Sequence, residues 1–175
     1  GVQPIETDLG EYILQLRNDH PSHIIAPAIH LNLEDVSEAF HEHHHRPKSD
    51  DPAVLMQEAR EMLRKQFVSA DVGITGANFC VAETGSTIIV TNEGNGDLTQ
   101  TLPKTHIVIT SIEKVVPTLE DMTLFQRLLA RSATGQEFTV YNTLSTGPRR
   151  ADDQDGPENF HVVLVDNGRS EMIGS

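Results

Sequence analysis

Residues 78–96 read NFCVAETGSTIIVTNEGNG, and this stretch decides the class of fold that the sequence predicts. It holds two short apolar runs, 78–82 and 87–92, each followed by small polar residues, which is typical of β-strands. A third apolar run follows at 105–112, and helical patterns lie before and after these runs. Near-continuous apolar strands that alternate with helices predict an α/β fold, with a mixed, largely parallel sheet covered by helices.

Capping residues and helical spacing predict four helices outside this stretch. They run from a cap at Asp8 to Asn18, from a cap at Asn32, from Pro52 to about Phe67, and from Thr118 to Gly135. Further strands are predicted at 23–26 (HIIA, short and buried), 138–144 and 160–166, with a long polar loop between the last two. We expect one domain over residues 1–175, truncated at both ends.

The charge of the chain excludes several classes of partner. Thirteen basic and 26 acidic residues among 175 give a net charge of −13, which argues against nucleic acid and against an anionic membrane surface. No apolar run is long enough for a transmembrane helix, so a cytoplasmic protein is expected. The single cysteine, Cys80, is too few for a disulfide or a metal cluster, and a buried hydrophobic role is favoured over a catalytic thiol.

The run HEHHH at residues 41–45 satisfies the H-E-x-x-H spacing of zinc proteases. It lies at the expected end of a helix, two residues before Pro47 and among charged residues. A catalytic zinc helix is packed and has a third ligand, so a solvated linker is the favoured interpretation and no metal site is predicted.

Two small-residue turns and one arginine pair are the candidate sites. The turns at 83–86 and 93–96 either reverse the chain or hold an anion with backbone N–H groups, and the residues alone leave both open. Arg149 and Arg150 follow a Gly-Pro turn, where they either clamp a carboxylate or phosphate or belong to a solvated loop. The signatures of P-loop, Rossmann and serine-hydrolase sites do not occur.

Five stretches together resemble one family. They are ETDLGEYILQL (6–16), PSHIIAPAIH (21–30), ADVGITGANFCVAETGSTIIVTNEGNG (70–96), THIVITSIEKVVPTLEDMTLFQRLLARSATGQ (105–136) and TGPRRADDQDGPENFHVVLVDNGRS (146–170). The chain is similar over nearly its whole length to the lactate-utilisation (LUD) domain of the lactate-utilisation protein B family of iron–sulfur proteins.

The resemblance implies a fold like that of glucosamine-6-phosphate deaminase, ribose-5-phosphate isomerase and the CoA transferases. It implies a role in a cytoplasmic bacterial oxidoreductase complex that oxidises L-lactate to pyruvate, with electron transfer through two [4Fe–4S] clusters in the full-length protein. Those clusters belong to a C-terminal ferredoxin-like region, so no cofactor is expected in this fragment, which alone is not expected to be catalytically competent. Whether the domain itself takes part in catalysis stays open.

The resemblance favours a site for a small carboxylate or phosphate anion, of the lactate or pyruvate kind, at the carboxyl ends of the sheet strands. The candidate ligand-binding residues are Glu83, Thr84, Gly85, Ser86, Asn92, Glu93, Gly94, Asn95, Gly96, Arg149 and Arg150. Glu83 and Glu93 are the candidates for a general base. The alternative is a non-catalytic assembly module that contacts sister subunits of the complex, and a sugar-phosphate isomerase or CoA transferase rests on fold analogy alone.

Overall fold

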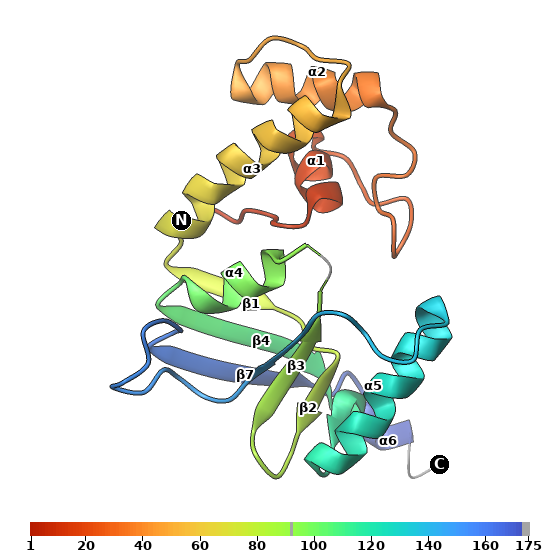
Figure 1. The fold of residues 1–175 in the computed structure, drawn as a ribbon, viewed down its shortest axis with the longest axis vertical. Coiled ribbons are helices and arrows are strands. Elements are labelled where there is room, and N and C mark those ends of the chain that lie inside the picture. The colour runs from red at the N-terminus through yellow and green to blue at the C-terminus, as the bar shows by residue number, and fades with distance from the viewer. Residues whose placement is uncertain (92, 173–175) are drawn as a thin grey trace. The chain divides into compact units, whose positions relative to one another are not determined.

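A computed structural model of the chain describes residues 1–91 and 93–172 (Figure 1). The chain divides into two compact units, residues 1–69 and 70–175, and each is described by itself. The expectation of one domain over residues 1–175 stays a prediction.

Three helices build the first unit, as predicted. They are α1 (Leu9–Arg17), α2 (Leu33–His44) and α3 (Pro52–Ser69). Asp8 caps α1, Asn32 and Asp35 form a reciprocal capping box on α2, and the Asp51 carboxylate accepts a hydrogen bond from the backbone of Ala53 in α3. Each cap satisfies backbone N–H groups that have no partner within the helix, which is why these helices begin where the sequence predicts.

The apolar stripes of the three helices meet in one core. Its buried members are Tyr12, Ile13, Phe40, Leu55, Ala59, Leu63 and Phe67.

The predicted buried strand at 23–26 is wrong. Ile24 and Ile25 are 97% and 87% exposed, and the segment forms bends and turns. Nδ1 of His23 accepts hydrogen bonds from the backbone N–H groups of Ile25 and Ala26, both at 3.1 Å. A side chain that binds the backbone locally competes with strand pairing, so the apolar letters alone were misleading.

The second unit contains two sheets. Its strands are β1 (Val72–Thr75), β2 (Phe79–Val81), β3 (Ser86–Val90), β4 (Thr105–Ser111), β5 (Val115–Val116), β6 (Asn142–Ser145) and β7 (Asn159–Val165). The order β1-β4-β7 is parallel throughout, whereas in β5-β2-β3-β6 only β2 and β5 are parallel. The predicted α/β class with mixed, largely parallel pairing is therefore confirmed. Strand β4, which follows β2 and β3 in the chain, belongs to the other sheet.

The helices of this unit are α4 (Asn95–Thr101), α5 (Leu119–Thr134) and the short α6 (Arg169–Met172), and a 3₁₀ turn spans Ile112–Lys114. The predicted caps of α5 are confirmed: Thr118 accepts a hydrogen bond from the backbone of Asp121, and Gly135 ends the helix at φ 74°. Met122 of α5 packs with Val81, Ile88 and Val116.

Helix α4 was not predicted, because two glycines and an asparagine at its start favour a turn. Gly94 precedes it at φ 73°, a left-handed conformation that glycine adopts readily. The helix packs directly on β1, where a Cβ added to Gly73 would lie 1.9 Å from the Thr99 carbonyl oxygen. Tertiary packing on a glycine therefore holds a segment that local propensity disfavours.

Candidate functional site

The loop between β6 and β7 is held in shape by its own hydrogen bonds. The backbone N–H of Arg149 donates to the Pro157 carbonyl at 2.8 Å, and its guanidinium pairs with Glu158 at 2.9 Å. The N–H of Glu158 donates to the carbonyl of Lys104 at 2.7 Å, which ties the loop to the start of β4. Gly156 has a φ of 106°, a conformation that side chains rarely adopt. These contacts hold the loop in one defined conformation beside the start of β4.

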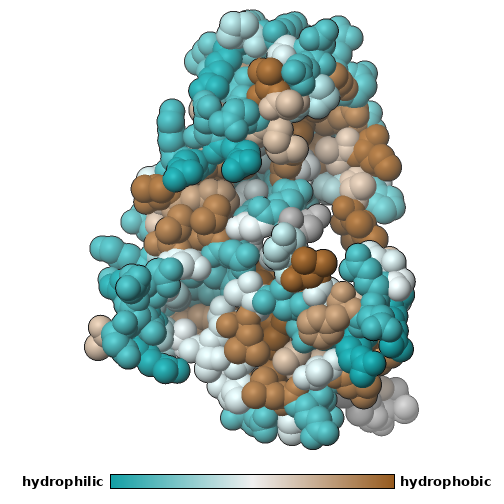
Figure 2. Space-filling view, in the orientation of Figure 1, coloured by the Kyte–Doolittle hydropathy of each residue, from teal (hydrophilic) through white to brown (hydrophobic). Residues whose placement is uncertain are grey.

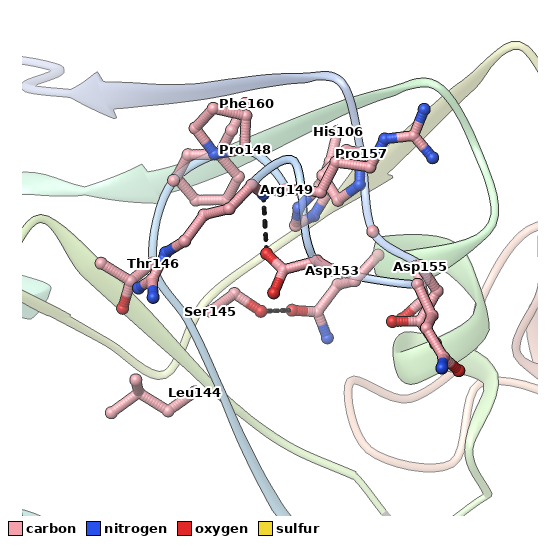
Figure 3. A pocket seen from close by; sticks show the side chains of 16 residues that line it. His106, Leu144, Ser145, Thr146, Pro148, Arg149, Asp153, Asp155, Pro157 and Phe160 are labelled. Atoms are coloured by element: carbon pink, nitrogen blue, oxygen red, sulfur yellow. Dashed lines mark hydrogen bonds between the residues drawn. The ribbon is translucent and has the colours of Figure 1, made fainter.

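A cavity of about 390 Å³ lies under this loop (Figure 3). Its lining includes side chains from the end of α4, from β4 and β6, and from the loop, among them Gln100, His106, Ser145, Thr146, Arg149 and Arg150. His106 and Phe160 are the second residues of β4 and β7, so the cavity lies at the amino ends of these parallel strands. The sequence placed a site at the carboxyl ends.

The charges of the cavity lining are balanced, in contrast to the rest of the chain. The lining contains two arginines, Arg149 and Arg150, and two aspartates, Asp153 and Asp155, so its formal charges cancel in a chain of net charge −13. Asp153 accepts a hydrogen bond from the backbone N–H of Arg150 at 2.7 Å. Arg149 pairs with Glu158, whereas within the described residues no ion pair forms at the Arg150 guanidinium. Of the two arginines in the lining, Arg150 is therefore the one whose guanidinium has no carboxylate partner among the described residues.

His106 is the most deeply buried polar side chain of the lining, at 1% exposure. Its Nε2 lies 2.8 Å from the Thr75 hydroxyl, and its ring meets Phe160 edge-on at 5.4 Å. Nδ1 is buried without a hydrogen-bond partner in the described part of the chain. Burial lowers the pKa of His106, so the imidazole is neutral at pH 7.

Sequence reasoning missed His106, although a signal was present. His106, Val108 and Thr110 alternate along β4 as its buried positions, so a titratable side chain replaces an apolar one in the inward row. Ser145 and Gln100 were missed as well. The Ser145 hydroxyl donates to Oε1 of Gln100 at 2.8 Å, the dashed contact beside Ser145 in Figure 3, and Nε2 of Gln100 donates to the Gly96 carbonyl at 3.1 Å.

The first predicted turn has a structural role and does not line the cavity. The Glu83 carboxylate accepts a hydrogen bond at 2.9 Å from the backbone of Leu119, the first residue of α5. The Thr84 and Ser86 hydroxyls lie 2.7 Å apart, and that of Ser86 lies 2.6 Å from Thr146 in the cavity wall. Gly85 turns the chain at φ 68°. The turn supports the cavity wall, and ligand contact by its residues stays a prediction.

The second predicted turn begins α4 and is also outside the lining. Glu93 is exposed just before the helix, Gly94 is its N-cap, and Asn95 and Gly96 are its first two residues. A Cβ on Gly96 would lie 2.8 Å from the Thr91 methyl group, so this glycine allows close packing. Asn92 lies outside the described residues. Of the predicted positions, Arg149 and Arg150 line the cavity, and a base role for Glu83 or Glu93 stays a prediction.

The histidine run is not entirely a solvated linker, which corrects the sequence interpretation. His41, His43 and His44 all lie within α2, and the His44 side chain is 2% exposed. Its Nδ1 is 2.7 Å from Glu58, itself 5% exposed, and its Nε2 is 2.8 Å from the Tyr12 hydroxyl. Across residues 1–91 and 93–172, no three His, Cys, Asp or Glu side chains are grouped to hold a metal ion.

Cys80 is buried and unpaired, as predicted, and burial raises the pKa of its thiol. A raised pKa keeps the sulfur protonated, which suits a packing role. In the described ranges, no helix combines the length and apolar character that a membrane span needs.

Comparison with known proteins identifies the class of this α/β domain. The LUD domain family matches residues 1–165, and the chain belongs to that family. The chain is 53% identical over 176 residues to "Lactate utilization protein B" of Geobacillus kaustophilus, and 54% identical over 176 residues to the protein of the same name from Shouchella clausii. It is 50% identical over 175 residues to "Uncharacterized electron transport protein YkgF" of Escherichia coli.

Each of these alignments covers 100% of this chain and 37% of the relative, so the chain spans little more than a third of their length. Among solved structures, a DUF162 family protein from Deinococcus radiodurans is similar with a TM-score of 0.45 and 19% identity, over 92% of this chain and 84% of that one.

Proposed function

We propose that this chain is the small-anion binding domain of a protein that takes part in lactate utilisation, and that the cavity beneath residues 146–158 binds a small carboxylate. The observation that carries the proposal is the Arg150 guanidinium, which lines a charge-balanced cavity and has no carboxylate partner among the described residues. A guanidinium is a planar, permanently charged donor that suits carboxylates and phosphates. The names of the relatives indicate lactate or pyruvate as the first ligands to test.

For the whole protein, we propose a part in the oxidation of L-lactate to pyruvate. The E. coli relative is named an electron transport protein, which supports a role in carrying the electrons away. The iron–sulfur clusters implied by the family resemblance would belong to segments outside residues 1–175, because one cysteine cannot ligate a [4Fe–4S] cluster.

The test of the binding site is thermal melting in the presence of lactate, pyruvate or phosphate, each added separately. A ligand of the native state at about 100-fold excess over its Kd stabilises the protein by about 2.7 kcal/mol, which raises the melting temperature. We expect lactate and pyruvate to raise it, and the double variant Arg149→Ala/Arg150→Ala to lose the shift.

The matched control is Arg127→Ala/Arg131→Ala. It removes the same charge from exposed positions on α5 that do not line the cavity, so it should keep the full shift. A double variant at 149 and 150 that still responds like the unmodified chain would refute the arginine site. No shift with any of the three anions would refute the binding function itself.

A second candidate function, an assembly module that contacts sister subunits, is favoured by a different observation. Leu124 and Leu128, one turn apart on α5, are 57% and 52% exposed, and apolar residues reach the surface in several places (Figure 2). Under this hypothesis Leu124→Glu/Leu128→Glu would abolish co-sedimentation with the sister subunits of the complex, whereas the arginine double variant would not. Unchanged co-sedimentation of the leucine variant would argue against it.

A further inference from the structure

We infer that His106 recognises the oxygen on the second carbon of a small 2-hydroxy or 2-oxo carboxylate held in this cavity, through its Nδ1 atom. The inference rests on the proposed carboxylate site and deepens it, because it names the residue that contacts the part of the ligand beyond the carboxylate.

The first argument is the unmatched ring nitrogen. His106 is 1% exposed and lines the cavity, yet Nδ1 has no partner among the described residues. A buried polar atom left without a hydrogen bond is destabilising, and native structures satisfy most such atoms with protein, water or ligand. Nδ1 itself is covered by protein atoms, so a ligand oxygen would satisfy it by displacing the side chains that separate this atom from the cavity.

The second argument is that the ring is held in one orientation before any ligand arrives. The Thr75 hydroxyl on β1 lies 2.8 Å from Nε2, and Phe160 on β7 meets the ring edge-on at 5.4 Å. The rest of the cavity lining comes from Gln100 and Thr101 of α4 and from residues 144–150 and 153–157. A binding group that is already oriented loses little conformational entropy when the ligand binds.

The third argument is that this pair can serve both oxidation states of one ligand. A neutral imidazole carries its proton on one nitrogen, and a hydroxyl group either donates or accepts. When Thr75 donates to Nε2, Nδ1–H donates to the carbonyl oxygen of a 2-oxo acid. When Thr75 accepts from Nε2–H, the lone pair of Nδ1 accepts from the hydroxyl of a 2-hydroxy acid. A rotation of one hydroxyl therefore allows lactate and pyruvate to bind alike.

The charged groups of the cavity define where the carboxylate would lie. Arg149 and Arg150 come from the loop, together with Asp153 and Asp155, and none of these lies on the strand that carries His106. The carboxylate would bind on the loop side, at Arg150, and the oxygen on the neighbouring carbon would face β4.

The test compares three acids with the same carbon skeleton, propionate, lactate and pyruvate, by titration calorimetry. Propionate lacks the oxygen on the second carbon. We expect the unmodified chain to bind lactate and pyruvate about 10-fold more tightly than propionate, the order of magnitude of one net hydrogen bond.

Two variants separate the ring nitrogens. In His106→Gln the amide reaches the position of Nε2, so contact with Thr75 is kept and Nδ1 is lost. In His106→Asn the shorter amide takes the position of Nδ1. We expect the glutamine variant to bind all three acids alike, at the affinity of propionate, and the asparagine variant to keep a preference for lactate and pyruvate. A role confined to packing would weaken all three acids equally in both variants.

Nitrogen NMR of histidine-labelled, unmodified chain is the second measurement, and it keeps the inference testable if a variant does not fold. The Nδ1 signal of His106 should shift with lactate and pyruvate but not with propionate. Equal affinity for the three acids, or a preference that survives in His106→Gln, would overturn the inference and assign Nδ1 to a bound water. In those cases Arg150-dependent binding would still support the proposed function, whereas no binding of any acid would overturn both.

Discussion

The two units each hold a buried histidine side chain, and the two rings differ in how their nitrogens are bonded. His44 in the helical unit has Glu58 at one nitrogen and Tyr12 at the other, at 2.7 and 2.8 Å. Phe40 packs against the ring at 4.6 Å. His106 in the α/β unit has Thr75 at one nitrogen and no described partner at the other.

This difference separates a structural histidine from a candidate binding residue. A ring whose two nitrogens are both hydrogen-bonded within the chain has no donor or acceptor left for a ligand. The bonds of His44 instead connect helices α1, α2 and α3. A ring with one unmatched nitrogen beside a cavity keeps a donor or acceptor available. Burial alone does not distinguish the two histidines, because both side chains are buried. The number of ring nitrogens with a hydrogen-bond partner distinguishes them.

The largest expected effect comes from removing a hydrogen-bond partner of His44, the histidine whose two ring nitrogens are both bonded. Glu58→Ala would leave the buried His44 without its carboxylate, and we expect the free energy of unfolding to fall by about 3 kcal/mol. Urea denaturation followed by far-UV circular dichroism measures it. Glu61→Ala on the same helix is the matched control, because Glu61 pairs with Arg46 at 2.8 Å but is 45% exposed, and a loss below about 1 kcal/mol is expected. Equal losses in the two variants would contradict the structural role of His44.

The next effect concerns the packing of α4 on β1, the strand that pairs with the one carrying His106. Gly73→Ala would place a Cβ 1.9 Å from the Thr99 carbonyl, so α4 must move off β1. We expect the α/β unit to lose about 2 kcal/mol of stability, together with ligand-induced stabilisation, because Gln100 and Thr101 of α4 line the cavity. Gly76→Ala, whose added Cβ would come no closer than 3.9 Å to its neighbours, should change stability by less than about 1 kcal/mol. If both variants melted alike, α4 would not depend on this contact.

The smallest effect is the pH dependence of His106. Its pKa in the folded chain lies below the ordinary value of 6.5 because of burial, so below that pH the unfolded state binds a proton that the folded state does not. The contribution to stability is therefore present above about pH 6.5 and is lost as the pH falls through the folded pKa, by at most about 1.4 kcal/mol per pH unit.

Urea denaturation of the unmodified chain and of His106→Gln between about pH 7.5 and pH 5.5 isolates this contribution, because the other titrating groups are shared by both proteins. We expect the stability of the variant to depend less on pH. Parallel profiles would show that His106 is not held neutral by burial.

The local features of the fold were predictable, and the contents of the site were not. Asp8, Asn32 and Thr118 bind backbone groups two or three residues away, so their caps could be read from neighbouring letters. Of the candidate site, only Arg149 and Arg150 line the cavity, because a Gly-Pro turn with paired charges is a local signal. His106, Gln100 and Ser145 come from three different elements, and no local pattern shows that they meet.

The amino-acid sequence by itself therefore determined the α/β class, the first residues of helices α1, α2, α3 and α5, the LUD family and the arginine pair. All of these depend on contacts within a few residues or on similarity along the chain. The tertiary structure alone decided that Ile24 and Ile25 are exposed and that residues 95–101 form a helix. It also decided that the turns at 83–86 and 93–96 lie outside the cavity lining. Only the structure shows that both ring nitrogens of His44 are hydrogen-bonded, whereas Nδ1 of His106 has no described partner. These features depend on residues that are distant in the chain, and packing brings such residues together only after the local elements exist.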